Sequence, residues 1–468
     1  MSGRIIHLAL AAAAVSITAA AHADFRAALE EYNARRYDAA HAQFLQLAEL
    51  GDCSSQFNLG AMALKGEGEP KDAGSAAGWF QAAAGNGCQQ LVRNALPDLE
   101  KRLDAGESRA AAAIVGRFGH EALRAQGIVD PEFRCSALTP ASVLEAPAAE
   151  FPHAPDGTSG SAPREALVIT GLTIGADGLA RDPEILLAVP DKGFAAAAVE
   201  AWLNSRFKPA SRGGAPVESR LQAKLVFGVE GGKGLTGLDA LRAATAGAHA
   251  GNAQASYTTG IVATLDSSLG ISPAQGLDLL LAAARDGESR AQYWLGSQLR
   301  AASACHPDVD GSVWLRHAAD GGSAAARLIL AEQLLAGAPS AAQAAQARSL
   351  LDQASGADSF YVAKHVTALL AASPLDAVRD PPTALKVALR LTKGEIQSDP
   401  QMFEAVAAAY AANGDFRNAA ASERLAIRKA EAIAWRTRAM KERLGAYRAG
   451  KPWRGELLTT RLAAQGTP

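Results

Sequence analysis

The chain has 468 residues, of which 49% are hydrophobic and 20% are charged. This length and hydrophobic content exclude disorder throughout the chain and provide enough apolar side chains for a substantial buried core. Because 46 Lys and Arg stand against 48 Asp and Glu, the chain lacks the excess of positive charge that drives non-specific binding to phosphate backbones. We therefore expect no nucleic acid partner.

The first residues have the pattern of an export signal. Arg4 lies in a short polar start, a hydrophobic run follows over 8–21, and an Ala-His-Ala sequence ends at Ala23, before Asp24. We expect a signal peptide over 1–23, cleaved after its last alanine. The alternative is an uncleaved anchor, but the run is shorter than the ~20 residues that a membrane-spanning helix needs. The mature chain is therefore expected in the periplasm, without an integral membrane span.

Four cysteines are present, and in an oxidising compartment they can pair in three ways that the sequence does not distinguish. We expect one disulfide in the N-terminal half of the chain. The spacings contain no Cys-x-x-Cys, so we expect no closed zinc site. The cysteines are Cys53, Cys88, Cys135 and Cys305.

A repeat of about 35 residues is the most informative property of the sequence. Each copy begins at a glycine, has a small residue four positions on, an aromatic residue or leucine six positions on, and a small residue nine positions on. The first glycines of the copies are Gly51, Gly251, Gly287 and Gly322, and the residues nine positions on are Gly60, Gly260, Gly296 and Ala331.

A second pattern precedes the glycines. Trp79, Leu279 and Trp314 each lie four residues ahead of an Ala-Ala pair, and a glycine follows each pair. Small residues let two helices approach closely, glycines end helices, and the aromatic residue fills the space between hairpins. The two patterns together predict a helix-turn-helix unit.

The segment from Leu59 to Trp79 contains the loop GEGEPKD, which includes Gly66 and Gly68. It resembles the Sel-like subclass of tetratricopeptide repeats, whose units consist of a helix, a Gly-rich loop and a helix. The later copies lack the full loop pattern. The resemblance implies an α-solenoid with a long concave face that suits extended segments of other proteins.

Residues 405–430 contain a second repeat type, at ordinary tetratricopeptide spacing, with an Asn-Gly turn at Asn413-Gly414. The pattern predicts one helix before the turn and a second from about Phe416. Basic residues follow Trp435. We interpret them as the solvated face of a capping helix, and binding of an acidic partner or an anionic lipid surface is the alternative.

Between the two repeat blocks the composition changes. Residues 136–164 are rich in Pro, Ala, Ser and Gly and read as a linker. Strands are predicted over 167–175, 185–190 and 223–229, and a helix over 194–205. The middle of the chain is therefore expected to be a small α+β unit.

The segment over 202–227 resembles the end of a TonB C-terminal domain, with a helix that ends in an aromatic residue, Phe-x-Pro-Ala, Gly-x-Pro-Val and a closing strand. The resemblance implies structural roles for these residues, and an exposed strand edge to which an extended peptide can add. The matching residues are Trp202, Phe207, Pro209, Ala210, Gly214, Pro216, Val217 and Phe227.

Energy transducers of that family have an N-terminal membrane anchor and a proline-rich spacer, whereas this chain is expected to have a cleavable signal and repeats. We therefore interpret the unit as a peptide-binding or assembly module. Participation in TonB-type energy transduction for outer-membrane transport is the alternative.

Three other patterns give no catalytic prediction. The Gly-x-Gly-x-x-Gly over 232–237 is followed by no βαβ unit, so we interpret it as a linker. The polar run Cys305–Asp308 falls where a loop between helices is expected. No nucleophile elbow, His-Glu-x-x-His or paired carboxylates have a convincing context, so we assign no catalytic, cofactor-binding or metal-binding residue. An unrecognised hydrolase remains a third hypothesis.

The sequence therefore predicts a mainly α protein, an α-solenoid in two blocks with a small α+β domain between them. Its predicted function is a non-enzymatic periplasmic scaffold that binds other envelope proteins or extended peptides. The expected parts are the signal peptide (1–23), N-terminal Sel-like repeats (24–125), a linker (126–164), the TonB-like domain (165–230), a second Sel-like block (231–372), and tetratricopeptide-like repeats with a basic C-terminal helix (373–468).

Overall fold

The computed structural model describes residues 25–129, 131, 137–144, 165–190, 193–228, 239–302 and 311–458. The expected signal peptide, the Gly-x-Gly-x-x-Gly segment and the Cys305–Asp308 run lie outside these residues. Helices make up most of the described chain and strands a small part of it, so the expectation of a mainly helical protein with a small sheet is confirmed.

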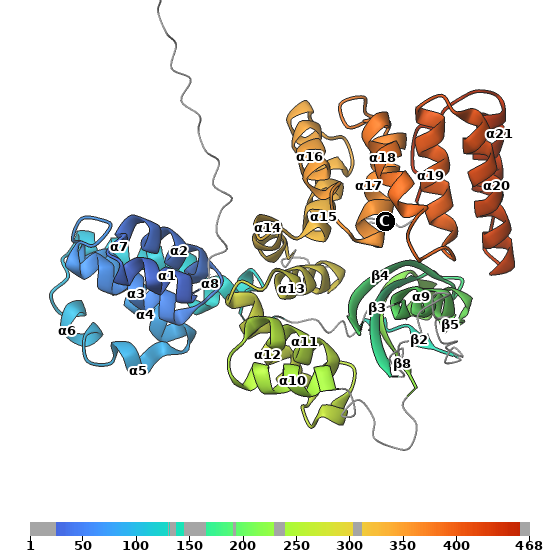
Figure 1. Cartoon of the computed structure of the whole chain (residues 1–468). Coiled ribbons are helices and arrows are strands. Elements are labelled where there is room, and N and C mark those ends of the chain that lie inside the picture. The colour runs from blue at the N-terminus through green and yellow to red at the C-terminus, as the bar shows by residue number, and fades with distance from the viewer. Residues whose placement is uncertain are drawn as a thin grey trace, which may run out of the picture.

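The N-terminal helices lie together at one end of the molecule (Figure 1). Chain neighbours α1 and α2, α2 and α3, and α3 and α4 pack on each other, and α7 packs back on α4. The elements are α1 (Phe25–Asn33), α2 (Tyr37–Glu49), α3 (Cys53–Lys65), α4 (Ala73–Ala83), a π-helical turn (Ala84–Cys88), α5 (Gln89–Val92), α6 (Leu96–Glu100), α7 (Ala105–Phe118) and α8 (His120–Ala125).

The helices that follow the last strand also pack mainly on their chain neighbours, and α15 to α21 stand side by side in Figure 1. They are α10 (Asp239–His249), α11 (Ala253–Ala263), α12 (Pro273–Arg285), α13 (Ser289–Ala302), α14 (Ser312–Asp320), α15 (Ala324–Leu335), α16 (Ala341–Ala354), α17 (Phe360–Ala372), α18 (Pro381–Leu391), α19 (Pro400–Ala412), α20 (Phe416–Ala432) and α21 (Arg438–Arg448). A 3₁₀ turn, Ser267–Leu269, connects α11 to α12.

The glycine at the start of each repeat copy ends a helix in the left-handed region, where a side chain would be strained. Gly51, Gly251, Gly287 and Gly322 have φ values of 79°, 78°, 89° and 90°. In each case the next residue donates its backbone N–H to a carbonyl five residues back, as Asp52 does to Leu47. This is the Schellman pattern of a helix C-terminus, and it makes the four turns alike.

The glycine nine positions further on lies where the next helix crosses. A Cβ atom at Gly260 would be 2.8 Å from the carbonyl oxygen of Gly276, and one at Gly296 would be 3.0 Å from that of Gly311. At Gly60 the obstacle is the ring of Phe80, at 2.6 Å. Each hairpin therefore depends on a missing side chain at its crossing point.

A further repeated contact was not visible in the sequence pattern. Gln56 and Gln292, five positions after their glycines, donate from Nε2 to the carbonyl oxygens of Ala48 and Ala284, at 3.2 and 2.9 Å. Arg327 does the same from Nε to Ala319, at 3.1 Å. A polar side chain thus satisfies a carbonyl at the end of the preceding helix in three copies.

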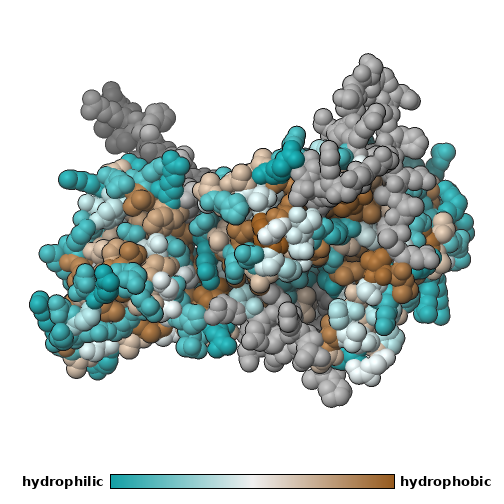
Figure 2. Space-filling view, turned by 90° about the horizontal axis from the view of Figure 1, so that it is seen from below, coloured by the Kyte–Doolittle hydropathy of each residue, from teal (hydrophilic) through white to brown (hydrophobic). Residues whose placement is uncertain are grey.

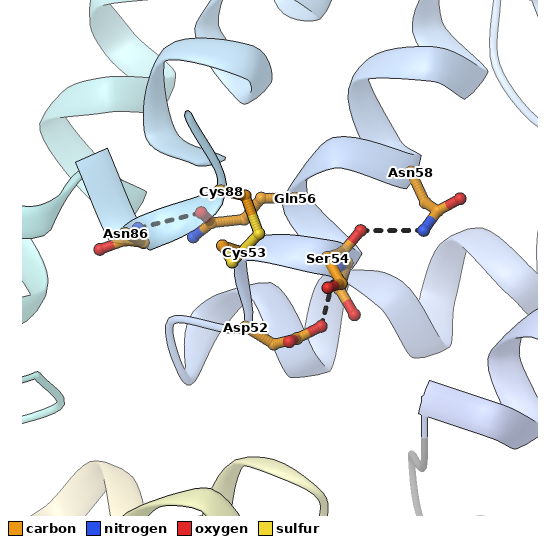
Figure 3. The surroundings of a disulfide bond; sticks show 8 residues. Asp52, Cys53, Ser54, Gln56, Asn58, Asn86 and Cys88 are labelled. Atoms are coloured by element: carbon orange, nitrogen blue, oxygen red, sulfur yellow. Dashed lines mark hydrogen bonds between the residues drawn. A yellow bond between two sulfur atoms is a disulfide. The ribbon is translucent and has the colours of Figure 1, made fainter. Parts of the chain in front are cut away.

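One disulfide joins Cys53, at the start of α3, to Cys88, at the end of the π-helical turn (Figure 3). Beside it Asn86 donates to Gln56 Oε1 at 2.9 Å and to the carbonyl oxygen of Phe118 at 2.9 Å. The expected disulfide in the N-terminal half is therefore confirmed. Cys135 and Cys305 lie outside the described residues.

The middle unit is built on a three-stranded antiparallel sheet, in the order β4, β3, β8, with α9 (Phe194–Asn204) on one face. The strands are β3 (Ala166–Ile174), β4 (Ala180–Val189) and β8 (Ser219–Phe227). Val168 packs with Phe194 and Trp202 of the helix, as the alternation of a strand with one face toward a helix requires.

Part of the segment expected to be a linker, 126–164, forms strands. Residues 138–143 contain two short strands, β1 (Leu138–Thr139) and β2 (Ser142–Val143), which pair with β6 (Ala210–Arg212) and β5 (Phe207–Lys208). β6 also forms a hairpin with β7 (Ala215–Val217). Strands of two residues are too short to show an alternation of hydrophobic and polar residues. They could therefore not be recognised in this Pro- and Ala-rich segment.

The sheet unit is not a free-standing insert. The face of β3 opposite α9 places Leu167 and Ile169 in one core with Tyr257 of α11 and Trp294 of α13. On its other side α9 packs through Val199, in a core shared with α20 and α21. The unit therefore lies between the middle and the C-terminal helices, as Figure 1 shows.

The view from below shows hydrophobic residues in separate patches among hydrophilic ones, with no single continuous apolar face (Figure 2). Within the described part of the chain, we find no helix of the length and hydrophobicity that a membrane crossing requires.

Candidate functional site

Charged and polar side chains are buried where the sheet meets α13, α15, α17 and α19. The sheet contributes three of them, the helices contribute the others, and every one except Glu332 is mostly or completely withdrawn from solvent. The members of this cluster, which we call the interface network, are Asp182, Glu184, Arg220, Tyr293, Glu332, Tyr361, Lys364, His365, Asp399 and Gln401.

Asp182 occupies an irregular position in β4. Gly171 of β3 pairs with Glu184, and Thr173 pairs with Arg181, so two β4 residues face the single residue Leu172. Such a bulge re-aims a side chain, and Asp182 adopts a φ of 54°, which aspartate tolerates better than most residues. The carboxylate reaches Lys364 and His365 on α17.

Lys364 is completely buried, and its ammonium group has an acceptor for each of its three protons. Nζ lies 2.9 Å from Asp182 Oδ1, 2.9 Å from Asp399 Oδ2 and 3.1 Å from Gln401 Oε1. Burial alone would lower the pKa of Lys364, but the two carboxylates raise it above its ordinary value. The lysine is therefore held in its charged form.

His365 has a carboxylate at each ring nitrogen. Nε2 is 2.6 Å from Asp182 Oδ1, and Nδ1 is 3.2 Å from Glu332 Oε1. Burial opposes the charged form, yet the attraction of Asp182 and Glu332 raises the pKa of His365 to about 9. Both nitrogens therefore donate at neutral pH, and the imidazolium joins β4 to α15 and α17.

The other half of the network surrounds Glu184. Arg220 Nη2 lies 2.5 Å from Glu184 Oε2, and the hydroxyl of Tyr293 donates to Glu184 Oε1 at 2.6 Å. Burial raises the pKa of Glu184, while Arg220 and Tyr293 favour its ionised form. The Arg220 guanidinium also lies 5.8 Å from the ring centre of Tyr361 on α17.

These ionisable groups are directed at one another. Each cation of the network has a carboxylate partner, and the three acceptors around Lys364 use all of its protons. Geometry of this kind holds two structural units in one arrangement, because a buried charge without its partner is costly. We therefore interpret the interface network as a set of contacts that fixes the position of the sheet relative to the helices.

Most of the basic residues after Trp435 are exposed, as expected for a solvated face, but Arg443 belongs to a second buried cluster of ionisable side chains in the C-terminal helices. Arg443 is 4% exposed, and its guanidinium group contacts the carboxyl groups of Glu404 of α19 and Glu423 of α20. Burial raises the pKa of Glu423 to about 8. The remaining basic residues of the segment are exposed: Arg436, Arg438, Lys441, Arg448, Lys451 and Arg454.

The residues that matched the TonB-like pattern lie together in the sheet unit. Trp202, Phe207, Ala210 and Phe227 are buried in its core. Gly214 forms the β6–β7 turn with a φ of 84°. Of the other matching residues, Pro209 connects β5 to β6, and Pro216 and Val217 lie in β7.

The sheet has two edges, and they differ. The β4 edge meets α17, and the carbonyl oxygen of Leu186 accepts a hydrogen bond from the hydroxyl of Tyr257 at 3.0 Å. The other edge strand, β8, pairs only with β3 among the described strands. Of the two edges, β8 is therefore the one that could receive another strand.

The two repeat tryptophans fill spaces between helices. Trp79 packs on Phe118, with ring centres 4.6 Å apart. Trp314 is completely buried, and its Nε1 donates to the carbonyl oxygen of Gly127 at 3.1 Å, which joins α14 to the N-terminal helices. The two loop glycines, Gly66 and Gly68, have φ values of 74° and 80°.

The chain resembles one solved structure described as the crystal structure of c5321, a protective antigen present in uropathogenic Escherichia coli strains that displays an SLR fold. The identity is 12%, the match covers 90% of this chain and 82% of that chain, and the TM-score is 0.32. No family model and no curated protein matches the chain.

Proposed function

We propose that the chain is a non-enzymatic scaffold protein of the bacterial envelope that binds other proteins through the surface of an α-solenoid. The observation that carries this proposal is the interface network. Because its buried ionisable groups are paired with each other, they stabilise one arrangement of sheet and helices. A rigid row of helices offers a long surface for protein partners.

The proposal includes the domain limits and the location given by the sequence, with export through residues 1–23 and a mature chain in the periplasm. Expression of the full chain in a Gram-negative host tests both points. The expected result is recovery in the periplasmic fraction, with a mass that corresponds to a mature N-terminus at Asp24. Recovery of the full-length mass in the cytoplasm would contradict it.

Site-specific photo-crosslinking tests the scaffold function. Leu64 on α3 and Leu389 on α18 are exposed leucines on helix surfaces, at 39% and 40%, and each can be replaced by a photoreactive residue in the full chain. We expect discrete adducts with envelope proteins from at least one position. Absence of adducts from these and further helix positions, in cells that contain the folded protein, would contradict the proposal.

A second candidate function, participation in TonB-type outer-membrane transport, is favoured by the β8 edge. If a transporter peptide adds there, a labelled extended peptide should bind the full chain, and a strain without the protein should lose uptake of a siderophore or vitamin. Unchanged uptake, together with no binding of transporter peptides, would argue against this function and leave the scaffold proposal intact.

A further inference from the structure

A pocket of about 440 Å³ opens beside the sheet unit, where three connections meet. The β3–β4 turn provides Gly175, Ala176 and Asp177, the residue between β7 and β8 is Glu218, and Arg436 lies between α20 and α21. The last lining residue is Arg181 of β4. The pocket therefore combines residues far apart in the sequence and carries two acidic and two basic side chains.

Two of these four charged side chains, Arg181 and Asp177, form an ion pair with each other. Arg181 Nη1 lies 2.8 Å from Asp177 Oδ1, and Nη2 lies 2.5 Å from Oδ2. The same guanidinium lies 5.2 Å from the ring centre of Trp435. This bidentate, stacked arrangement fixes Arg181 and Asp177 as one wall of the pocket and leaves little of their charge for a ligand.

Glu218 and Arg436 differ from that pair. One carboxylate oxygen of Glu218, Oε1, is buried and accepts no hydrogen bond from the part of the chain that the structure describes. Burial also raises the pKa of Glu218. Arg436 is exposed, and no described carboxylate lies within ion-pair distance of it. A buried acceptor that lacks a donor is unusual in a folded protein and marks a place where a donor is missing.

We propose that this pocket binds a dipolar ligand, one that brings an ammonium or guanidinium group to Glu218 and a carboxylate to Arg436. The four lining charges sum to zero, so the pocket suits a ligand that carries both signs better than a simple anion or cation. A guanidinium binds carboxylates with a planar fork of donors, and an ammonium supplies three N–H donors to a carboxylate such as that of Glu218.

This chemistry occurs both in a free amino acid and in a polypeptide segment with neighbouring basic and acidic side chains. The proposal does not depend on the scaffold function, because a free amino acid would bind without any protein partner. Three probes separate the sources in binding titrations of the full chain by NMR or calorimetry. They are l-arginine, agmatine, which lacks the carboxylate, and the blocked peptide acetyl-Lys-Gly-Asp-amide.

Binding of l-arginine but not of the blocked peptide would assign a free amino acid, and the reverse would assign a polypeptide segment. Binding of both probes would support a pocket that recognises a cationic group together with a carboxylate in either kind of molecule. In wild type, agmatine should bind more weakly than l-arginine, and in Arg436→Gln the two should bind equally. No binding of either l-arginine or the peptide at low millimolar concentration would overturn the proposal.

Variants identify the pocket as the site. Glu218→Gln and Arg436→Gln should each weaken binding of the better probe about tenfold or more, because each removes one charge-assisted contact. Arg438→Gln is the matched control, since Arg438 lies two residues further on and pairs with Glu442 outside the pocket. Equal affinities for all three variants and wild type would overturn the proposal, and circular dichroism would verify that each variant is folded.

Discussion

Lys364 on α17 and Asp182 in β4 form a completely buried ion pair, with Nζ and Oδ1 2.9 Å apart. The pair connects the sheet unit to the C-terminal helices across a large sequence separation. Asp182 also contacts His365, so one carboxylate lies against two cations of the same helix. A single strand residue therefore joins the sheet to α17 through two charged contacts.

Asp182→Asn should destabilise the protein strongly. Asparagine keeps the shape of the side chain and tolerates the left-handed backbone, but it removes the negative charge that Lys364 and His365 share. Breaking a buried pair in this way costs about 3–5 kcal/mol. Chemical denaturation followed by circular dichroism would measure the loss in the free energy of unfolding.

Glu442→Gln is the control for that experiment, because it breaks the solvent-exposed pair of Arg438 and Glu442 on α21. Exposed pairs contribute little to stability. If the two variants unfold at the same denaturant concentration, the interface network does not hold the sheet in place.

Stability should fall as the pH rises above 7. The pKa of His365 is raised to about 9 in the folded chain from an ordinary 6.5. The stability that comes from its charged form is therefore fully present below about pH 6.5 and is lost as the pH rises through 9. The pKa of Glu423 is raised to about 8 in the folded chain, so folding favours its protonated form. Ionisation of Glu423 therefore also lowers the stability as the pH rises.

Denaturation midpoints measured between pH 6 and pH 10 test this dependence. The shift in the pKa of His365 limits the loss of unfolding free energy from its titration to about 3 kcal/mol. His365→Gln should be less stable than wild type at pH 6 and should show a shallower decline toward pH 10. A decline equally steep in the variant would assign the pH dependence to other groups.

Removal of the Cys53–Cys88 disulfide should destabilise the N-terminal helices. The bond joins residues 35 positions apart, and the entropy of closing such a loop in the unfolded chain corresponds to about 3–4 kcal/mol. The variant with both Cys53→Ser and Cys88→Ser leaves the other two cysteines unchanged. Limited proteolysis should then cut within α3 to α5 earlier than in the oxidised wild type, whereas an unchanged cleavage rate would show that packing alone holds these helices.

Gly260→Ala should destabilise the α11–α12 hairpin, because the added Cβ would lie 2.8 Å from the carbonyl oxygen of Gly276 and close to Leu280. Overpacking of this kind costs about 1–3 kcal/mol. Gly116→Ala on α7 is the matched control, since a Cβ there meets nothing within 4 Å. It should raise stability slightly through helix propensity. Thermal denaturation of both variants would show shifts of opposite sign, and a shared sign would contradict the close approach of the two helices.

Much of the local structure could be predicted from the sequence because it depends on local chemistry. The helix expected over 194–205 is α9, Phe194–Asn204, and the strand expected over 167–175 is β3, Ala166–Ile174. The first half of β4 was missed, because Asp182 and Pro183 interrupt its alternation at a bulge.

The interface network could not be predicted, because its members come from distant segments and no short motif joins them. A partial indication was present: Lys364 and His365 lie inside a helix that is otherwise almost entirely hydrophobic, and a buried lysine needs partners. The sequence shows that need, but only the packing of α17 against β4 identifies Asp182 and Asp399 as the partners.

A fragment limited to the sheet unit, residues 165–228, should not fold stably by itself. In the full chain Leu167 and Ile169 are covered by α11 and α13, and Val199 is covered by the C-terminal helices. The fragment would expose both surfaces and leave Asp182 and Glu184 without their helix partners. We expect an associated or molten state, with poor dispersion of amide NMR signals and binding of a hydrophobic dye. In the full chain the same β3 amides should be among the slowest to exchange with deuterium. A monomeric fragment with well-dispersed signals would show that the sheet unit is independent of the helices, and the interface network would then only attach it to them.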